Sequence, residues 1–257
     1  MNSWRVYFKN EWMKLIRQPQ VVWILLIGGW TLVGWAWLLG QGSMAGKRSV
    51  SFDGYFLGFF LPIQLISLPI FSLVFFVILY SERQNQTVSW LYRLPIRADR
   101  WYVAKFLTAW LLCLLVLLIS LLVAGFVLYG YATDVIDNLT MSQFFGKLMA
   151  ISAHLMLLTV PMWLTFFLLS SLIRTPTIAV LVLLVLQILT GFSHHFPNPF
   201  AALRLAIGYA SANGLISYQP ELQAQYVTAG VYVLLVALAV WLYGRWRPNK
   251  LVNFLLN

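Results

Sequence analysis

Charged residues are scarce in this 257-residue chain. Only 9% of the residues are charged and 61% are hydrophobic, whereas soluble domains average about 25% charged and roughly 45 to 50% apolar residues. A soluble core cannot bury that much apolar surface, so a soluble globular protein is excluded. The 7 acidic residues all lie in predicted loops or near a terminus. The sequence contains no paired-carboxylate, HExxH, GxSxG or glycine-rich phosphate-loop pattern, which argues against an enzyme.

Cysteine is almost absent as well. The one cysteine, Cys113, excludes a disulfide or a multi-cysteine metal site within the chain. We expect Cys113 to be a small packing residue. His194 and His195 are adjacent, but no nearby Cys, Asp or Glu would complete a metal site. We therefore predict no metal ion and no cofactor in this chain.

Long uncharged runs dominate what is present. Each of them exceeds the roughly 18 apolar residues that indicate a transmembrane helix. Helices are expected because backbone polar groups in hydrocarbon must be paired within the spanning segment. The fold class predicted is an all-α polytopic membrane protein, with residues 1–257 as a single transmembrane domain. The six predicted spans are 21–40, 56–80, 104–130, 148–172, 176–192 and 226–244.

The basic residues predict the orientation of these spans. Six spans place thirteen of the 17 Lys and Arg residues on one side, and basic residues are retained on the cytoplasmic side. Both termini and the 81–105 loop are therefore expected to be cytoplasmic, with the protein in a cell membrane, such as a bacterial plasma or inner membrane. The net charge of +10 is accounted for by this topology and by anionic headgroups of the lipid bilayer, so we predict no nucleic-acid partner.

Residues 1–20 are predicted to form a helix lying in the cytoplasmic interface of the membrane. The apolar side chains that share one face of this helix are Trp4, Phe8, Trp12 and Leu15. The basic side chains that lie away from it are Lys9, Lys14 and Arg17. Glu11 is the exception, because it falls near the apolar face. Three alternatives are open for Glu11: an ion pair with Lys14, an ion pair with a basic residue of the 81–105 loop, or solvent.

The 81–105 loop carries the densest charge in the chain. Within it, residues 86–94 are predicted to form a short amphipathic helix, because Val88, Leu91 and Tyr92 share one face. Pro95 ends that helix, since proline disfavours helical backbone in the residue before it. A hairpin that merely joins two spans is the alternative interpretation.

The predicted spans contain few polar groups that could hold an ion or a substrate. Ion-coupled carriers usually place ionisable groups inside the membrane, and here only His154 is plainly intramembrane. Gln64 and Gln187 are the other candidates for a substrate path. If the protein transports a substrate, we expect the energy to come from another subunit.

The 81–105 loop contains a spaced pattern formed by Glu82, Thr87, Leu91, Leu94, Pro95, Arg97 and Lys105. In this pattern the loop resembles the first cytoplasmic loop of the type 2 family of ABC transporter permeases. Gln86 stands where that family usually has glycine. Two more segments, 11–17 and 170–174, resemble the family's N-terminal E..K..R segment and its short loop between spans four and five.

The resemblance implies partners and a site. In that family the loop docks on a separate ATP-binding cassette subunit, and two permease subunits, identical or homologous, form the pathway. ATP and Mg are then expected on the partner, because this chain has no P-loop sequence. Residues 193–225 would form an external re-entrant hairpin, although a surface loop is equally compatible with the sequence. The residues expected to couple to the ATPase are Glu82, Thr87, Val88, Leu91, Tyr92, Leu94, Pro95 and Arg97.

The function predicted from these observations is the permease subunit of an ABC exporter. The apolar, aromatic-rich spans favour an amphipathic or hydrophobic substrate such as a peptide, an antibiotic or a lipid. Within the family the chain resembles antimicrobial-peptide immunity and drug-resistance permeases. The alternatives are a non-transport membrane scaffold or sensor and an ion-coupled secondary carrier. Association with an ATPase discriminates the first function from the others.

Overall fold

A computed structural model describes residues 3–45, 59, 68–84, 98–132, 140–172, 175, 178, 181–182, 185 and 219–246. Every regular element in these ranges is an α-helix, which confirms the all-α fold class for this part of the chain. The helices are α1 (Ser3–Arg17), α2 (Pro19–Ala45), α4 (Leu68–Gln84), α6 (Ala98–Ala132), α7 (Met141–Leu172) and α10 (Gln219–Trp246).

These helices coincide with most of the predicted spans. Apolar segments of 23 and 29 residues in α2 and α6, Pro19–Gln41 and Val103–Tyr131, are long enough to cross a membrane. Helix α10 begins at Gln219, so the last residues of the predicted 193–225 connection are helical. Most of the fifth predicted span, 176–192, falls outside the described residues, and the total of six spans stays a prediction.

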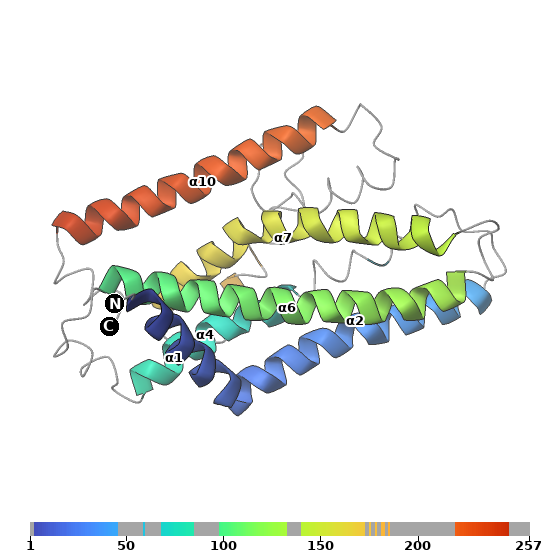
Figure 1. Ribbon diagram of the computed structural model, residues 1–257, viewed down its shortest axis with the longest axis horizontal. Helices are drawn as coiled ribbons and strands as arrows, with labels where there is room; N and C mark the ends of the chain where they lie inside the picture. Colours follow the sequence, from blue (N-terminus) through green and yellow to red (C-terminus); the bar gives the residue numbers. More distant parts are fainter. Residues whose placement is uncertain are drawn as a thin grey trace.

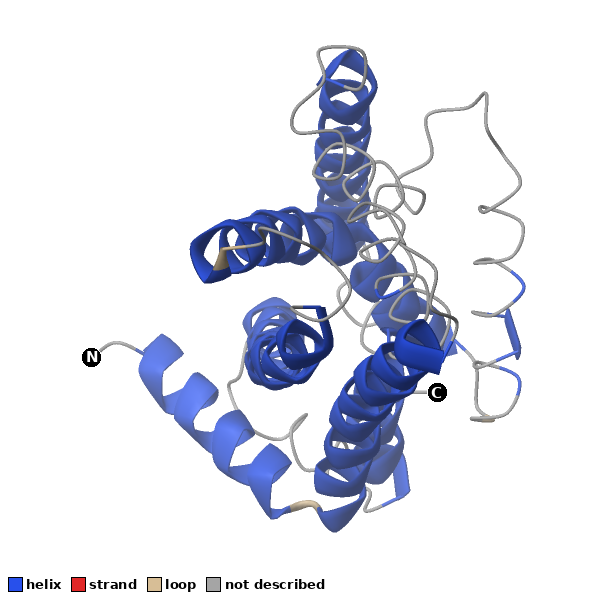
Figure 2. Ribbon diagram, turned by 90° about the vertical axis from the view of Figure 1, so that its right-hand side faces the viewer, coloured by secondary structure: helices blue, strands red, loops and turns tan. Residues whose placement is uncertain are grey.

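Four helices, α2, α4, α6 and α7, run beside one another, and α10 lies against α7 (Figure 1). Helix α1 lies across one end of this bundle (Figures 1 and 2). The last turn of α4 and the first turn of α6 lie at the same end (Figure 1). The chain that connects them, residues 85–97, is the centre of the predicted coupling loop and lies outside the described residues.

The turn between α1 and α2 is centred on Gln18. The Gln18 N–H donates to the Leu15 carbonyl at 3.2 Å, and the Val21 and Val22 N–H groups donate to the Gln18 carbonyl at 3.1 and 3.2 Å. Pro19 is the first residue of α2, a position that tolerates proline because the N–H there has no intrahelical acceptor. The chain therefore changes direction between the crosswise helix α1 and the long helix α2.

Glycine brings α2 and α6 into close contact. A Cβ atom on Gly29 would lie 2.5 Å from Ser120 Oγ, and one on Gly40 would overlap the Tyr131 ring. Small residues of this kind let helix backbones approach closely in membranes. The two contacts are eleven residues apart on each helix, so α2 and α6 keep one register over about three turns.

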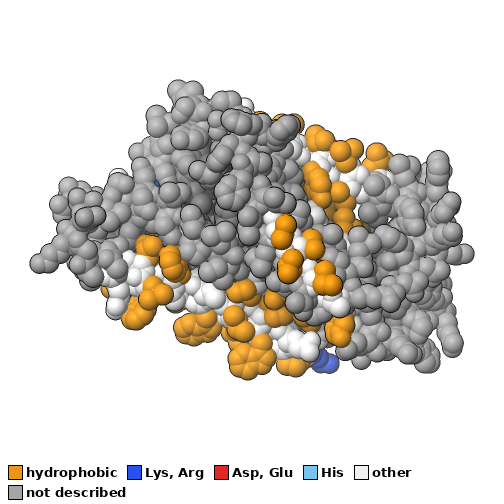
Figure 3. All heavy atoms as spheres, turned by 180° about the vertical axis from the view of Figure 1, so that it is seen from behind, with side chains coloured by type: hydrophobic (Ala, Val, Ile, Leu, Met, Phe, Trp, Pro, Cys, Tyr) orange, Lys and Arg blue, Asp and Glu red, His pale blue; other side chains and the backbone are white. Residues whose placement is uncertain are grey.

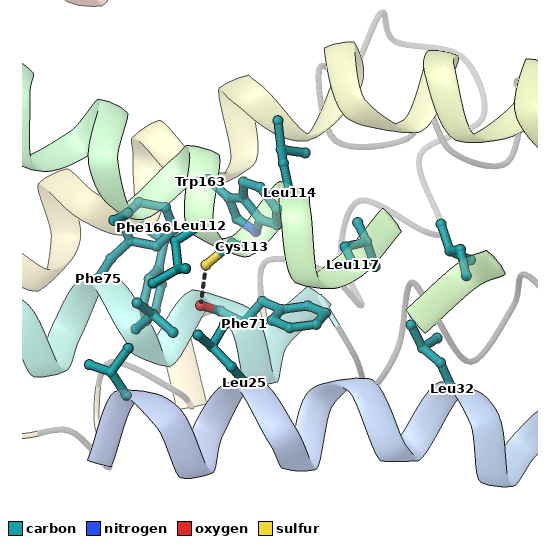
Figure 4. Packing of buried hydrophobic residues seen from close by; sticks show 14 of the residues in the cluster. Leu25, Leu32, Phe71, Phe75, Leu112, Cys113, Leu114, Leu117, Trp163 and Phe166 are labelled. Atoms are coloured by element: carbon teal, nitrogen blue, oxygen red, sulfur yellow. Dashed lines mark hydrogen bonds between the residues drawn. The ribbon is translucent and has the colours of Figure 1, made fainter. Parts of the chain in front are cut away.

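Aromatic rings hold α4, α6 and α7 together. Phe75 of α4 lies 5.7 Å from Phe106 of α6 and 6.0 Å from Trp163 of α7, measured between ring centroids. Nearby, Cys113 is fully buried and its thiol donates to the Phe71 carbonyl, with 3.7 Å between sulfur and oxygen (Figure 4). This confirms the expectation that Cys113 is a packing residue.

The N-terminus of α7 is closed by a capping box. The Gln143 N–H donates to Thr140 Oγ1 at 3.3 Å, and the Thr140 N–H donates to Gln143 Oε1 at 3.4 Å. This reciprocal arrangement satisfies two backbone donors at the start of a helix. Thr140 therefore determines where α7 begins.

The outer faces of the helices are apolar. From behind the molecule, hydrophobic side chains dominate the visible part of the described residues (Figure 3). Trp23 and Trp30 of α2 and Leu234 of α10 are among the most exposed apolar side chains. Such surfaces suit contact with lipid hydrocarbon or with other membrane helices.

Candidate coupling junction

An ion pair joins α1 to α6 at the end of the bundle where α1 lies. The Lys105 Nζ atom lies 2.8 Å from Glu11 Oε2, although the two residues are 94 positions apart. Both residues are withdrawn from solvent, with exposed fractions of 4% for Glu11 and 1% for Lys105. A second, more exposed lysine, Lys14, lies 3.3 Å from Glu11 Oε1. Of the alternatives for Glu11, the structure therefore contains both ion pairs and excludes the solvated carboxylate.

Trp101 provides a second contact for the buried ammonium group. Lys105 Nζ lies 4.3 Å from the centre of the Trp101 ring, which is a cation–π distance. Trp101 precedes Lys105 by about one turn of α6 and is itself buried. Leu15, one turn after Glu11 in α1, is also buried beside this site. The charge of Lys105 is therefore held between a carboxylate and an aromatic face.

The burial of this pair determines its energetic weight. Removing one partner of a buried ion pair leaves an uncompensated charge and costs about 3 to 5 kcal/mol. The Lys14 side chain is half exposed, and pairs of that kind contribute roughly 0 to 1 kcal/mol. The Glu11–Lys105 contact is thus the polar interaction that anchors α1 on α6.

A different contact joins the turn after α1 to α4. Gln18 Nε2 donates to Ser81 Oγ at 3.0 Å, and the Ser81 hydroxyl donates to the Ile78 carbonyl at 3.1 Å. Gln18 Oε1 is buried and has no hydrogen-bond partner in the part of the chain that the structure describes. A neutral hydrogen bond contributes about 0.5 to 1.5 kcal/mol net. Removing this contact should therefore cost less than removing one partner of the buried ion pair.

Together these contacts define what we call the junction: Glu11, Gln18, Ser81, Trp101 and Lys105. Ser81 lies three residues before the end of α4, and Trp101 lies three residues after the start of α6. The chain around α1 thereby contacts both helices that flank residues 85–97.

The predicted coupling residues lie next to the junction or outside the described residues. Glu82 follows Ser81 in the last turn of α4. The contacts of the other seven stay predictions, because these residues are not described: Thr87, Val88, Leu91, Tyr92, Leu94, Pro95 and Arg97.

Helix α1 has a buried side and an exposed side. Glu11 and Leu15 form a buried face toward the protein, while Met13 and Ile16 are apolar side chains with exposed fractions of 39% and 50%. The basic side chains exposed on this helix are Lys9, Lys14 and Arg17. A helix that combines a protein-facing, an apolar and a basic surface is suited to the membrane interface. Of the side chains expected on one apolar face, Leu15 is buried and Phe8 and Trp12 are half-buried, and the interfacial position of this helix stays a prediction.

Whether the predicted substrate-path residues lie together stays a prediction. His154 belongs to α7, whereas Gln64 and Gln187 lie outside the described residues. A polar contact that the sequence did not predict lies further along α7. The Thr165 hydroxyl donates to the Pro161 carbonyl at 2.8 Å and is hydrogen-bonded to the Tyr232 hydroxyl of α10. This contact ties α10 to α7 next to the proline.

No group of three or more metal-ligating side chains occurs among the described residues. His194 and His195 lie outside them.

The sequence analysis missed the Gln18–Ser81 contact. Neither residue is charged, and glutamine at a helix break has no pattern that names its partner. The sequence indicated more clearly that Lys105 has a partner, because Lys105 is the last cation before a long uncharged run. A charge at the edge of hydrocarbon requires a partner or headgroup contact.

Two helices long and apolar enough to cross a membrane, with apolar outer faces, suit a helical membrane protein. The model of the ABC-2 family transporter proteins matches residues 7–193, which is more than half of the chain. The chain therefore belongs to this family and is a membrane permease subunit of an ABC transporter, whose ATP-binding cassette ATPase is a separate subunit. The match includes the whole junction and the 81–105 loop. No curated protein matches the chain.

Proposed function

We propose that this chain is the permease half of an ABC exporter, which moves an amphipathic or hydrophobic substrate out of the cytoplasm or the inner leaflet. The observation that carries the proposal is the junction. Helix α1 is anchored by a buried ion pair to one helix flanking the 81–105 loop, and the turn that follows α1 is hydrogen-bonded to the other. A loop that only connects two spans would not require contacts from the α1 region to both flanking helices.

In this proposal the 81–105 loop docks on the ATPase through the apolar face of Val88, Leu91 and Tyr92. Burying one such side chain contributes roughly 1.5 to 3 kcal/mol, whereas a surface ion pair contributes about 0 to 1 kcal/mol. Docking therefore depends more on the apolar face than on any single arginine. Glu82, Thr87, Leu94, Pro95 and Arg97 complete the surface that couples to the ATPase.

The proposed assembly has two permease subunits, identical or homologous, and two ATPase subunits that bind ATP and Mg. Its orientation places the junction and both termini in the cytoplasm of a cell with this chain in its plasma or inner membrane. Two observations support this orientation. Thirteen of the 17 basic residues fall on the predicted cytoplasmic side, and the flanking ends of α4 and α6 lie at the same end of the bundle as α1 (Figure 1).

The proposed substrate is a peptide, an antibiotic or a lipid. The chain is 16% aromatic and 61% hydrophobic, which suits an amphipathic molecule better than a small ion. Ion-coupled carriers bind their driving ion through ionisable groups inside the membrane. In the predicted spans, His154 is the one group of this kind that lies plainly inside the membrane. We assign His154, Gln64 and Gln187 as candidates for contact with the substrate.

Purification in mild detergent tests the proposal. We expect an ATP-binding cassette ATPase to copurify with the chain, and Leu91→Asp to reduce that association while the protein still inserts in the membrane. The control Arg100→Ala should retain the ATPase, because it removes a charge without disturbing the apolar face. A parent protein that inserts normally and never binds an ATPase would favour the scaffold or carrier alternatives. If the Leu91→Asp variant bound the ATPase as well as the parent, the loop would only connect two spans.

A further inference from the structure

The contacts of the junction differ in kind on its two sides. On the α6 side, the Glu11 carboxylate and the Lys105 ammonium form a buried pair 2.8 Å apart, with Lys105 also over the Trp101 ring. On the α4 side, the described contact is a neutral hydrogen bond between Gln18 and Ser81. Breaking the ion pair leaves two buried charges without partners. Breaking the Gln18–Ser81 hydrogen bond releases two neutral groups that can bind water.

Away from the junction, α6 also packs on α4 through the Phe75 and Phe106 rings and the Cys113–Phe71 hydrogen bond, so the asymmetry concerns the end of α4 at the junction. Helix α6 is interlocked with α2 where Gly29 meets Ser120 and where Gly40 meets Tyr131. Helix α1 continues into α2 through the backbone hydrogen bonds at Gln18. Helices α1, α2 and α6 are thus connected in a closed triangle by a buried ion pair, a close-packed helix seam and a tight turn.

We propose that Glu11 and Lys105 are positioning residues that keep α1, α2 and α6 together as one body while ATP is bound and hydrolysed. The end of α4 then moves relative to this body, and the Gln18–Ser81 hydrogen bond is the contact that opens. This inference rests on the proposed coupling function. It assigns the role to Glu11 and Lys105, outside the apolar docking face.

A charged pair performs this task differently from an apolar one. A buried carboxylate and ammonium must stay within contact distance, because moving α1 along α6 by a turn would leave two buried charges without partners. Two apolar side chains of similar size would bury equal surface at several positions of α1 along α6. The geometry therefore predicts that an apolar replacement keeps the protein folded but loses the register.

Distances between spin labels in the complete complex, reconstituted in nanodiscs, test this inference. One label pair joins α1 to α6 at the exposed residues Met13 and Val103, and the other joins α1 to α4 at Met13 and Gln84. Cys113 is buried, and an unsubstituted parent controls for its labelling. Each pair is measured without nucleotide and with Mg-ATP and vanadate. We expect the Met13–Val103 distribution to stay unchanged and the Met13–Gln84 distribution to shift by more than its width.

Substitutions at Glu11 and Lys105 distinguish a role in positioning α1 on α6 from a role in stability alone. The double variant Glu11→Leu with Lys105→Met should remain folded, with a broadened Met13–Val103 distribution and reduced coupling of ATP hydrolysis to the α4 movement. Lys105→Arg should retain a narrow distribution because it keeps the charge. The matched control Lys14→Gln removes the exposed partner of Glu11 and should behave as the parent.

Three results would overturn the inference: a nucleotide-dependent shift of Met13–Val103 as large as that of Met13–Gln84, no shift of either pair while ATP is hydrolysed, or a parent-like narrow distribution in the apolar double variant. If no ATPase copurifies, the proposed function fails instead. The broadening expected in the double variant is then still measured without nucleotide, so the two failures are distinguishable.

Discussion

The ammonium group of Lys105 lies 2.8 Å from the carboxylate of Glu11 and is buried with it between α1 and α6. A buried pair of this kind is not the most stabilising choice, because well-packed apolar residues of similar volume are often equally stable or better. The pair instead fixes the position of α1 on α6. It joins the crosswise helix to the first helix after the predicted coupling loop.

Breaking this pair on one side should destabilise the protein. We expect Glu11→Gln to lower the free energy of unfolding by about 3 to 5 kcal/mol, because it leaves the buried Lys105 charge without its carboxylate. Lys105→Met should cost less, because Glu11 keeps its contact with the more exposed Lys14. The double variant Glu11→Leu with Lys105→Met should recover most of this loss, whereas Lys14→Gln should change stability by about 0 to 1 kcal/mol. Denaturant or thermal unfolding in detergent measures these differences. Single variants as stable as the parent would contradict the assigned burial.

The seam between α2 and α6 should be intolerant of side chains at its glycines. Gly29→Leu places new atoms where Ser120 lies, and overpacking of this kind typically costs about 1 to 3 kcal/mol. Gly34 in the same helix is the matched control, because a Cβ there meets nothing within 4 Å. Gly34→Ala should be neutral or stabilising, since alanine favours a helix by roughly 0.5 to 1 kcal/mol. Equal effects of the two substitutions on thermal stability would argue against the seam.

The capping box of α7 gives a third prediction. Thr140→Ala removes the hydroxyl that accepts the Gln143 N–H and should destabilise the protein by about 0.5 to 2 kcal/mol. Thr140→Ser keeps the hydroxyl and should be close to the parent. Hydrogen exchange at the first turn of α7 reports the effect locally. Protection that is unchanged in Thr140→Ala would show that another group caps this helix.

Orientation is tested by cysteine labelling in intact cells. Because basic residues gather on the predicted cytoplasmic side, cysteines introduced at Ser89 and Asn249 should be protected from an impermeant thiol reagent. Cysteines at Ser49 and Asn213 should react. Native Cys113 is buried and supplies the background control. Strong external labelling at Ser89 would reverse the proposed topology.

Some of the site was predictable because it depends on local pattern. The amphipathic arrangement of residues 1–20 placed Leu15 on the buried face, and Glu11 stood out as a carboxylate among apolar neighbours. Its partner was narrowed to Lys14 or the basic residues of the 81–105 loop. The choice of Lys105 was not predictable, because it depends on how α1 lies across α6 and not on spacing along the chain.

The sequence by itself determined the solvent in which this protein folds and the elements that it uses. Uncharged runs longer than a bilayer is thick require helices, because hydrocarbon offers no partner for a backbone N–H or carbonyl. Motifs near residues 11–17 and 81–105 were sufficient to indicate the family. Only the tertiary structure decided which polar groups meet: Glu11 with Lys105, Gln18 with Ser81, and Thr165 with Tyr232. In an apolar chain nearly every helix face can be buried, so hydrophobic pattern alone does not specify the packing, and close contacts at glycine and paired polar atoms select one arrangement.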